Sequence, residues 1–233
     1  FSAYRRAGAE YVFFIGCAGR TFAAGETRKT LILLQKLDVN FTVVDDVCCG
    51  GLHRSAGLKD SGGMVAENVL QRILATGSSK VITACPHGLY TMRTHPVYKD
   101  KIEAKHVLEL LDGIKFGVDR EDRAVAYHDP CFLSRRLGIS EPPRHMISRT
   151  GARLIEMENT REHTVCCGSR DGEFILDPDV AHAMAARRAA QAADTGADVL
   201  LTACAACRRA FAEAAPNMPV YTICEYLADH YNG

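Results

Sequence analysis

The cysteines of this chain recur in the same order in its two halves, and this repeat constrains the fold more than any other feature. In each half a single cysteine is followed by an adjacent pair with a glycine after it, and then by the sequence Thr-Ala-Cys. These positions are Cys17, Cys48, Cys49, Gly50 and Cys85 in the first half, and Cys131, Cys166, Cys167, Gly168 and Cys204 in the second. The spacings also agree, with 30 and 34 residues before the pair and 35 and 36 residues after it. Matching order, spacing and flanking residues indicate an internal duplication.

Ten cysteines in 233 residues are more than core packing requires. A disulfide framework is disfavoured, because cysteines adjacent in sequence bridge each other only with strain, and a chain of this length buries an adequate core without covalent staples. Thiol ligands for a metal, in a reducing compartment, are the better interpretation. Cys224 lies outside the repeated pattern, and we expect it to be a small buried apolar residue.

The overall composition is that of a globular protein. Hydrophobic residues make up 47% of the chain and charged residues 24%, which excludes wholesale disorder. The 28 basic and 28 acidic residues give a net charge of zero, so no nucleic-acid partner is expected. No apolar run approaches the roughly 18 residues that cross a bilayer, and we expect a soluble chain. Because it begins with Phe1 rather than Met and has no signal peptide, we expect a piece of a longer or processed chain.

Short apolar runs alternate with helical stretches along both halves. The predicted buried strands are 11–15, 41–46, 80–84, 124–129, 153–157 and 199–203. The predicted helices include Thr27 to Leu37 and, most clearly, Asp177 to Ala193, where Asp177-Pro178 supplies the N-cap and first helical residue. This alternation predicts an α/β fold of two duplicated lobes, each a small parallel sheet flanked by helices. A charged, glycine-containing stretch at 112–123 marks the boundary, and we assign the lobes to 1–116 and 117–233.

Four of the cysteines directly follow predicted strands, and in open α/β sheets ligands bind at the carboxyl ends of the strands. These are Cys17, Cys85, Cys131 and Cys204. The thiols of each half are therefore expected to converge on one crevice at that edge of the sheet. Zinc takes four tetrahedral ligands, whereas the second half offers a fifth thiol, Cys207, in a C-x-x-C sequence. Five thiols in a reducing compartment suit an iron–sulfur cluster better than zinc.

The complete pattern, C-x(30–38)-C-C-G-x(33–36)-C-x-x-C, resembles the cysteine-rich CCG domain of the heterodisulfide reductase family of iron–sulfur oxidoreductases. His128-Asp129-Pro130-Cys131 looks like the HDPC segment of that family, and the likeness covers residues 11 to 231. Relatives include iron–sulfur subunits of anaerobic glycerol-3-phosphate, lactate and glycolate dehydrogenases. The resemblance implies a non-cubane [4Fe-4S] cluster that is held by five cysteines and splits a disulfide with single electrons. Carried over to this chain, the five ligands are Cys131, Cys166, Cys167, Cys204 and Cys207.

The first half departs from the family pattern, because Gly88 stands where the last cysteine of C-x-x-C is expected. Three interpretations remain open. The remaining thiols hold an ordinary [4Fe-4S] cubane, or they hold an altered cluster that His87 or another group completes, or the site is empty and survives as scaffold. We favour a bound cluster, since four of the five ligands remain. These four are Cys17, Cys48, Cys49 and Cys85.

The sequence does not identify a catalytic side chain, and the cluster of the second half is itself the expected reactive centre. His87 is a candidate ligand or proton donor beside the first cluster, or a histidine that starts a helix after Pro86. His128 is a candidate hydrogen-bond donor to cluster sulfur, with a structural role in its loop as the favoured alternative. Arg187 and Arg188, in an alanine-rich helix, are expected on its exposed face or at a subunit contact.

Together these inferences predict an iron–sulfur oxidoreductase subunit resembling heterodisulfide reductase. It would take single electrons from a partner subunit with iron–sulfur clusters or flavin and pass them to a disulfide or trisulfide substrate. The alternative is an electron relay between a flavin dehydrogenase or hydrogenase-type partner and quinone, without disulfide chemistry. A structural zinc or metal-storage module is a third class, and nucleotide binding is disfavoured because its glycine fingerprint is absent. We expect a cytoplasmic location, either free or on the cytoplasmic face of a membrane through other subunits or segments.

Overall fold

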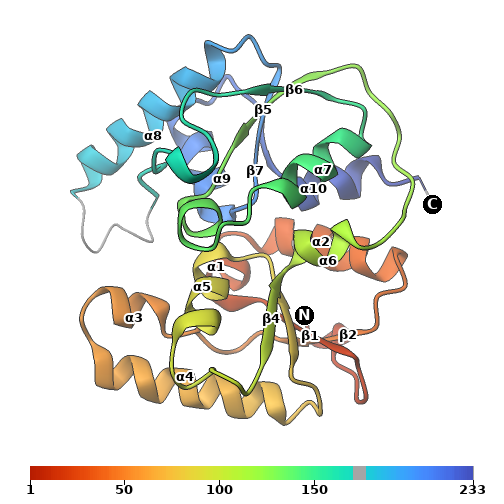
Figure 1. The fold of residues 1–233 in the computed structure, drawn as a ribbon, viewed down its shortest axis with the longest axis vertical. Helices are drawn as coiled ribbons and strands as arrows, with labels where there is room; N and C mark the ends of the chain where they lie inside the picture. Colours follow the sequence, from red (N-terminus) through yellow and green to blue (C-terminus); the bar gives the residue numbers. More distant parts are fainter. Residues whose placement is uncertain (170–176, 233) are drawn as a thin grey trace. The chain divides into compact units, whose positions relative to one another are not determined.

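The computed structural model describes residues 1–169 and 177–232. The chain divides into two compact units, Phe1–Leu110 and Leu111–Gly233. Each unit contains one four-stranded sheet with helices around it (Figure 1). All strand pairs are parallel, so the predicted α/β fold with a parallel sheet in each half is confirmed.

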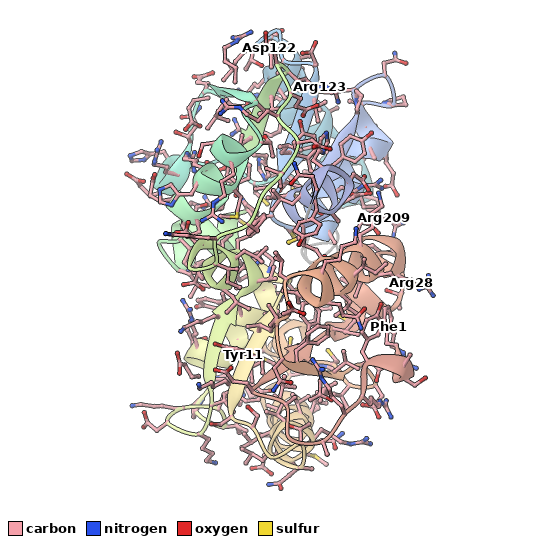
Figure 2. The ribbon with its side chains drawn as sticks, turned by 90° about the vertical axis from the view of Figure 1, so that its right-hand side faces the viewer. Phe1, Tyr11, Arg28, Asp122, Arg123 and Arg209 are labelled. Carbon is pink, nitrogen blue, oxygen red and sulfur yellow. The ribbon has the colours of Figure 1, made fainter. Side chains whose placement is uncertain are left out.

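The sheet of the first unit has the strand order β2-β1-β3-β4. Its strands are β1 (Tyr11–Phe14), β2 (Phe41–Val44), β3 (Lys80–Thr83) and β4 (Glu103–His106). The helices in chain order are α1 (Gly16–Arg20), α2 (Ala24–Lys36), α3 (Gly51–Ser55), α4 (Lys59–Leu74), α5 (Pro86–Thr94) and α6 (Val107–Asp112), and a 3-10 turn, η1 (Ser2–Tyr4), precedes β1. Beside that turn the guanidinium carbon of Arg28 lies 5.7 Å from the ring centroid of Phe1, and Figure 2 labels both residues.

The sheet of the second unit has the strand order β6-β5-β7-β8. Its strands are β5 (Ala124–His128), β6 (Arg153–Glu156), β7 (Val199–Thr202) and β8 (Val220–Thr222). The helical segments are a π-helical turn, η2 (Phe132–Arg136), α7 (Glu141–Arg149), a 3-10 turn, η3 (Arg161–His163), α8 (Pro178–Ala193), α9 (Ala205–Ala214) and α10 (Ile223–His230). In Figure 1, α8 and α9 pack together on one face of this sheet, and α7 and α10 pack on the other.

The two sheets share one topology, which is what an internal duplication requires. In each unit the first strand lies between the second and third, and the fourth strand extends the sheet beyond the third. The register agrees as well, because Phe13 pairs with Ile82 in the first unit and Tyr127 pairs with Leu201 in the second. The residue that follows each of these, Phe14 or His128, therefore occupies an equivalent place at the end of its strand.

The central strands form the core of each unit. Every residue of β5 and of β7 is buried, and so are three of the four residues of β1. Strands covered by helices on both faces need continuous apolar runs, which is why the sequence predicted these strands. The edge strands β4 and β8 were not predicted, because β4 is largely polar (Glu103–His106) and β8 contains only three residues.

Helix α8 confirms the predicted helix at Asp177 to Ala193. The Asp177 side chain accepts a hydrogen bond from the backbone N–H of Asp179, as an N-cap does. Arg187 is exposed as expected, but the expectation for Arg188 was wrong, because only 1% of its surface is accessible. Arg188 shares the buried stripe of this helix with four alanines, and backbone carbonyls satisfy its guanidinium. These alanines are Ala181, Ala185, Ala189 and Ala192.

Within the described part of the chain, no helix has both the length and the apolar character that a membrane span requires.

Candidate metal centre

The five cysteines predicted as ligands in the second unit lie together. Cys131 follows β5 after Asp129 and Pro130, Cys204 follows β7, and Cys207 lies in the first turn of α9. The adjacent pair comes from the segment after η3. Hydrogen bonds join Cys131 to Cys166, Cys166 to Cys167, and Cys204 to Cys207, and the Sγ atoms of Cys167 and Cys207 are 3.0 Å apart. The five sulfur atoms therefore form one continuous chain of contacts.

The pKa values of the thiols in this group are shifted in opposite directions. The pKa of Cys166 is lowered to about 2, because Cys131 and Cys167 donate hydrogen bonds to its sulfur. The pKa of Cys131 is raised by the same hydrogen bond and by burial. The pKa of Cys207 is raised by its hydrogen bonds with Cys167 and Cys204 and by burial. The Cys166 thiol, with its lowered pKa, thus lies next to Cys131, whose pKa is raised. Because metals bind thiolates, metal binding here would release thiol protons.

The four cysteines of the first unit form a similar group. Cys17 and Cys49 donate hydrogen bonds to Cys48 and lower its pKa to about 2. The pKa of Cys49 is raised by its hydrogen bond to Cys48, by burial and by the charge of Cys85. Cys17 is the exposed member of the group, and Cys85 accepts a hydrogen bond from the backbone N–H of Gly88 at 3.3 Å. The structure thus brings together the four thiols predicted for the first half.

Gly88 marks the difference between the two groups. A Cβ atom built at Gly88 would lie 3.5 Å from Cβ and 3.6 Å from Sγ of Cys85, which is ordinary van der Waals contact. Position 88 therefore has room for a side chain directed at the thiols, although the sequence supplies none.

The glycine after each cysteine pair is required by the backbone. Gly50 and Gly168 have φ values of +80° and +68°. A Cβ atom at Gly168 would lie 2.3 Å from the carbonyl oxygen of Ala181 on α8, and one at Gly50 would lie 2.8 Å from that of Gly62 on α4. Only glycine combines this conformation with so close an approach to the neighbouring helix. The turn that carries each cysteine pair is thereby held against that helix.

His87, a candidate from the sequence, is buried in the first turn of α5. A Cβ atom built at Gly51 would lie 2.9 Å from Nε2 of His87 and 3.3 Å from Sγ of Cys49. The imidazole and this thiol therefore border the same small space at the backbone of Gly51. Its role as a ligand or proton donor stays a prediction.

His128, the second candidate, is fully buried at the end of β5. One of its ring nitrogens and the sulfur atoms of Cys167 and Cys207 lie within 4.8 Å of one another. Its ring packs edge-on against Phe211, with the centroids 4.8 Å apart. Burial, together with the nearby charge of Arg188, lowers the pKa of His128 to about 3. A neutral imidazole therefore lies beside the thiols of the second unit.

A buried ion pair fixes the loop that carries Cys131. The carboxylate of Asp129, which is inaccessible to solvent, receives two hydrogen bonds of 2.9 Å from the guanidinium of Arg144 on α7. Ser134 and the backbone N–H of Arg161 also donate to it, at 3.1 and 2.9 Å. Sequence reasoning missed Arg144. The only available signal was that an aspartate at the end of a buried strand needs a cationic partner.

The donor set fits an iron–sulfur cluster on its chemistry. Thiolates are the ligands of such clusters, and both groups present several thiols within contact distance. Nε2 of His128 is a buried nitrogen with no hydrogen-bond partner among the described residues. Leaving such a group unpaired costs about 1–3 kcal/mol. A sulfur-rich anionic group bound to the cysteines would supply the acceptor that this nitrogen lacks.

The family model of the cysteine-rich CCG domain matches the chain twice, at residues 11–93 and 125–212. Each match lies within one unit and includes all the cysteines of that unit's repeated pattern.

Three curated relatives of the chain carry the names of redox proteins. The chain is 33% identical over 219 residues to a subunit of the dihydromethanophenazine:CoB–CoM heterodisulfide reductase of Methanosarcina acetivorans, covering 86% of this chain and 53% of that protein. It is 27% identical over 180 residues to EtfAB:quinone oxidoreductase of Syntrophomonas wolfei, covering 73% and 25%. It is 25% identical over 243 residues to a probable iron–sulfur-binding oxidoreductase of Bacillus subtilis, covering 96% and 34%. The chain spans about half the length, or less, of these relatives.

Proposed function

This chain belongs to the family of cysteine-rich CCG domains, and on that premise we propose that it is part of an iron–sulfur oxidoreductase subunit resembling heterodisulfide reductase. It passes single electrons from a partner to a disulfide or trisulfide substrate. The observation that carries the proposal is the continuous contact chain of five thiols in the second unit. The similarity to a heterodisulfide reductase component supports the substrate class.

A non-cubane [4Fe-4S] cluster bound in the second unit would supply electrons one at a time to an S–S bond, so that two electrons and two protons convert a disulfide into two thiols. The five cysteines from Cys131 to Cys207 would hold it. Three of the thiols are buried, whereas Cys131 and Cys166 are partly exposed. The substrate sulfur therefore approaches from the side of these two residues. The ion pair between Asp129 and Arg144 keeps Cys131 in position for this approach.

The first unit holds a second cluster through its four thiols. The two CCG repeats, residues 1–116 and 117–233, thus each form a centre of their own. With four sulfur ligands and His87 nearby, the first centre suits a cubane or an altered cluster. Its task is to deliver electrons rather than to bind substrate, because the fifth thiol of the complete pattern is missing at Gly88.

Electrons come from other redox subunits, or from segments outside this chain, that carry iron–sulfur clusters or flavin. The chain's partial coverage of its relatives supports the need for such partners. The complex works in the cytoplasm or on the cytoplasmic face of a membrane.

A second candidate function is electron relay to quinone without disulfide chemistry. The similarity to EtfAB:quinone oxidoreductase favours it, as does the missing fifth thiol of the first unit. The two functions differ in whether the second cluster reacts with a disulfide.

The test is an anaerobic titration of the iron-loaded chain with a reduced viologen, followed by EPR with and without an added disulfide or trisulfide. Consumption of two electrons for each disulfide, together with a change in the EPR signal of the second cluster, supports disulfide cleavage. An EPR signal that is indifferent to both compounds supports relay. Zinc in place of iron contradicts both functions. The variant Cys207→Ser, which removes one of the five ligands, is the control that assigns the signal to the second unit.

A further inference from the structure

Arg188 on α8 carries a buried positive charge. It is the largest fully buried side chain of the described residues, with 1% of its surface exposed. Its guanidinium donates to the carbonyls of Glu158 and Asn159 at 2.5 and 3.1 Å, and to the side chain of Gln191 at 2.9 Å. Among the described residues no carboxylate forms an ion pair with it, and burial lowers its pKa although the charges of Asp129 and Glu158 act in the opposite direction. A buried cation of this kind needs a negative group nearby.

The Nε–H donor of Arg188 fixes the tautomer of His128. Nε of Arg188 lies 3.4 Å from Nδ1 of His128. Because an arginine nitrogen can only donate, Nδ1 must accept, and the imidazole proton must reside on Nε2. Nε2 has no partner among the described residues, and a nitrogen of this ring lies within 4.8 Å of the sulfur atoms of Cys167 and Cys207. The unpaired N–H is therefore available to a sulfur acceptor of the second centre.

The first unit lacks both members of this pair. The strand registers make Phe14 equivalent to His128. Helices α4 and α8 contain 16 residues each and precede β3 and β7 by the same interval, so Val69 is equivalent to Arg188. Phe14 and Val69 are buried and apolar. The duplicated framework thus has a polar, cationic pair beside one group of thiols and an apolar pair beside the other.

We propose that Arg188 is a positioning residue that holds His128 as an Nε2–H donor to the sulfur atoms of the second centre, and that this pair makes the second centre easier to reduce than the first. The inference rests on the proposed function in one respect, that an iron–sulfur cluster binds at the second centre.

The expected direction follows from charge. Reduction adds a negative charge to the cluster, and both an N–H donor and a buried guanidinium stabilise that charge. The negative cluster in turn adds to the compensation of this buried cation, which Asp129 and Glu158 provide only through their charges and not as ion-pair partners. The first centre has Phe14 and Val69 at these two positions and receives neither contribution from them. Electrons entering the chain should therefore collect at the second centre, where the substrate is reduced.

One test needs no cluster. Long-range proton–nitrogen NMR of the metal-free chain reports which ring nitrogen of His128 is protonated. We expect protonation at Nε2 alone in the wild-type chain, and exchange between the two tautomers in Arg188→Met. Protonation at Nδ1 in the wild-type chain would overturn the role of Arg188.

A second test measures the midpoint potential of the second cluster by EPR-monitored redox titration. His128→Phe, which installs the first-unit residue, and Arg188→Met should both shift the potential to more negative values. His128→Gln should have a midpoint potential closer to that of the wild-type chain than His128→Phe has, because the amide N–H of glutamine can replace Nε2–H as a donor. The matched control is Arg187→Met, on the exposed face of the same helix, which should leave the potential unchanged.

The outcomes separate the two proposals. A loaded His128→Phe cluster with an unshifted potential overturns the inference while the proposed function stands. If no chain binds iron, the proposed function fails, and the claim about the cluster potential fails with it. If a variant does not fold, the wild-type NMR measurement still decides whether Arg188 sets the tautomer.

Discussion

Gly88 of α5 stands at the position that Cys207 holds in α9. Each residue lies in the first turn of the helix that follows the third strand of its unit. Each also lies three positions after the cysteine at the N-cap of that helix, Cys85 or Cys204. A Cβ atom at Gly88 would be in ordinary contact with Cys85, 3.6 Å from its sulfur. The first unit therefore lacks the thiol at this position, although it has space for a side chain there.

Placing a thiol at position 88 should make the first centre hold iron for longer. In a chain whose second centre is disabled by Cys166→Ser, we expect Gly88→Cys to retain iron against a chelator about tenfold longer than Gly88→Ala. This difference corresponds to about 1.4 kcal/mol in the activation free energy of iron release. The alanine variant is the matched control, because it fills the same space without a ligand. Equal retention in the two variants would show that position 88 does not face the cluster.

The reciprocal change should weaken the second centre. Cys207→Gly reproduces the first-unit sequence at a residue whose sulfur is 3.0 Å from that of Cys167. We expect it to abolish the disulfide-sensitive EPR signal while the iron of the first unit remains. Cys224→Ala is the control, because Cys224 is buried as expected but lies outside the repeated pattern. Loss of the signal in Cys224→Ala as well would indicate general destabilisation rather than loss of a ligand.

The glycine after the second cysteine pair should tolerate no side chain. In Gly168→Ala the new Cβ combines a φ of +68° with a 2.3 Å approach to the carbonyl of Ala181. We expect the free energy of unfolding to fall by about 3 kcal/mol in denaturant titrations of the metal-free chain, from backbone strain and overpacking together. Gly196→Ala isolates the backbone term, since Gly196 has a φ of +72° and no atom within 4 Å of the added Cβ. That control should cost only about 1 kcal/mol. Equal losses would mean that the contact with α8 is unimportant.

The buried ion pair beside Cys131 should matter far more than an exposed one. Asp129→Asn removes the charge that Arg144 pairs with, and breaking such a buried pair typically costs about 3–5 kcal/mol of unfolding free energy. Glu213→Gln, which disrupts the exposed pair with Arg209, should cost about 0.3–0.5 kcal/mol. Denaturant titration of both metal-free variants measures the difference. A small effect of Asp129→Asn would rule out this pair as the support of the Cys131 loop.

The sequence predicted the features that repeat and those with a strong local pattern. The duplication, the parallel sheets and the convergence of the cysteines followed from spacing and from apolar runs that each half contains twice. Helix α8 followed from Asp177 and Pro178 at its start. Residue spacing, apolar runs and helix-start residues can all be recognised in one sequence without knowledge of the folded structure.

The sequence did not predict the polar partners that the fold buries behind the thiols. Arg188 was expected to be exposed, because arginines are mostly exposed and an alanine-rich helix does not show which of its faces packs on the sheet. Arg144 went unnoticed for the same reason, since its partner Asp129 lies in the loop after β5 and not on the helix of Arg144. Contacts between distant elements depend on the folded geometry, which no local pattern contains.

The most direct test of the account is the iron and acid-labile sulfide content per chain, prepared without oxygen, for the wild-type chain and Cys207→Gly. A cluster held by the five thiols of the second unit predicts at least about four irons and four sulfides per chain, and about eight of each if both centres are loaded. It also predicts that Cys207→Gly lacks the EPR signal that responds to a disulfide. Zinc in place of iron, or a disulfide-responsive signal that survives in Cys207→Gly, would contradict the account.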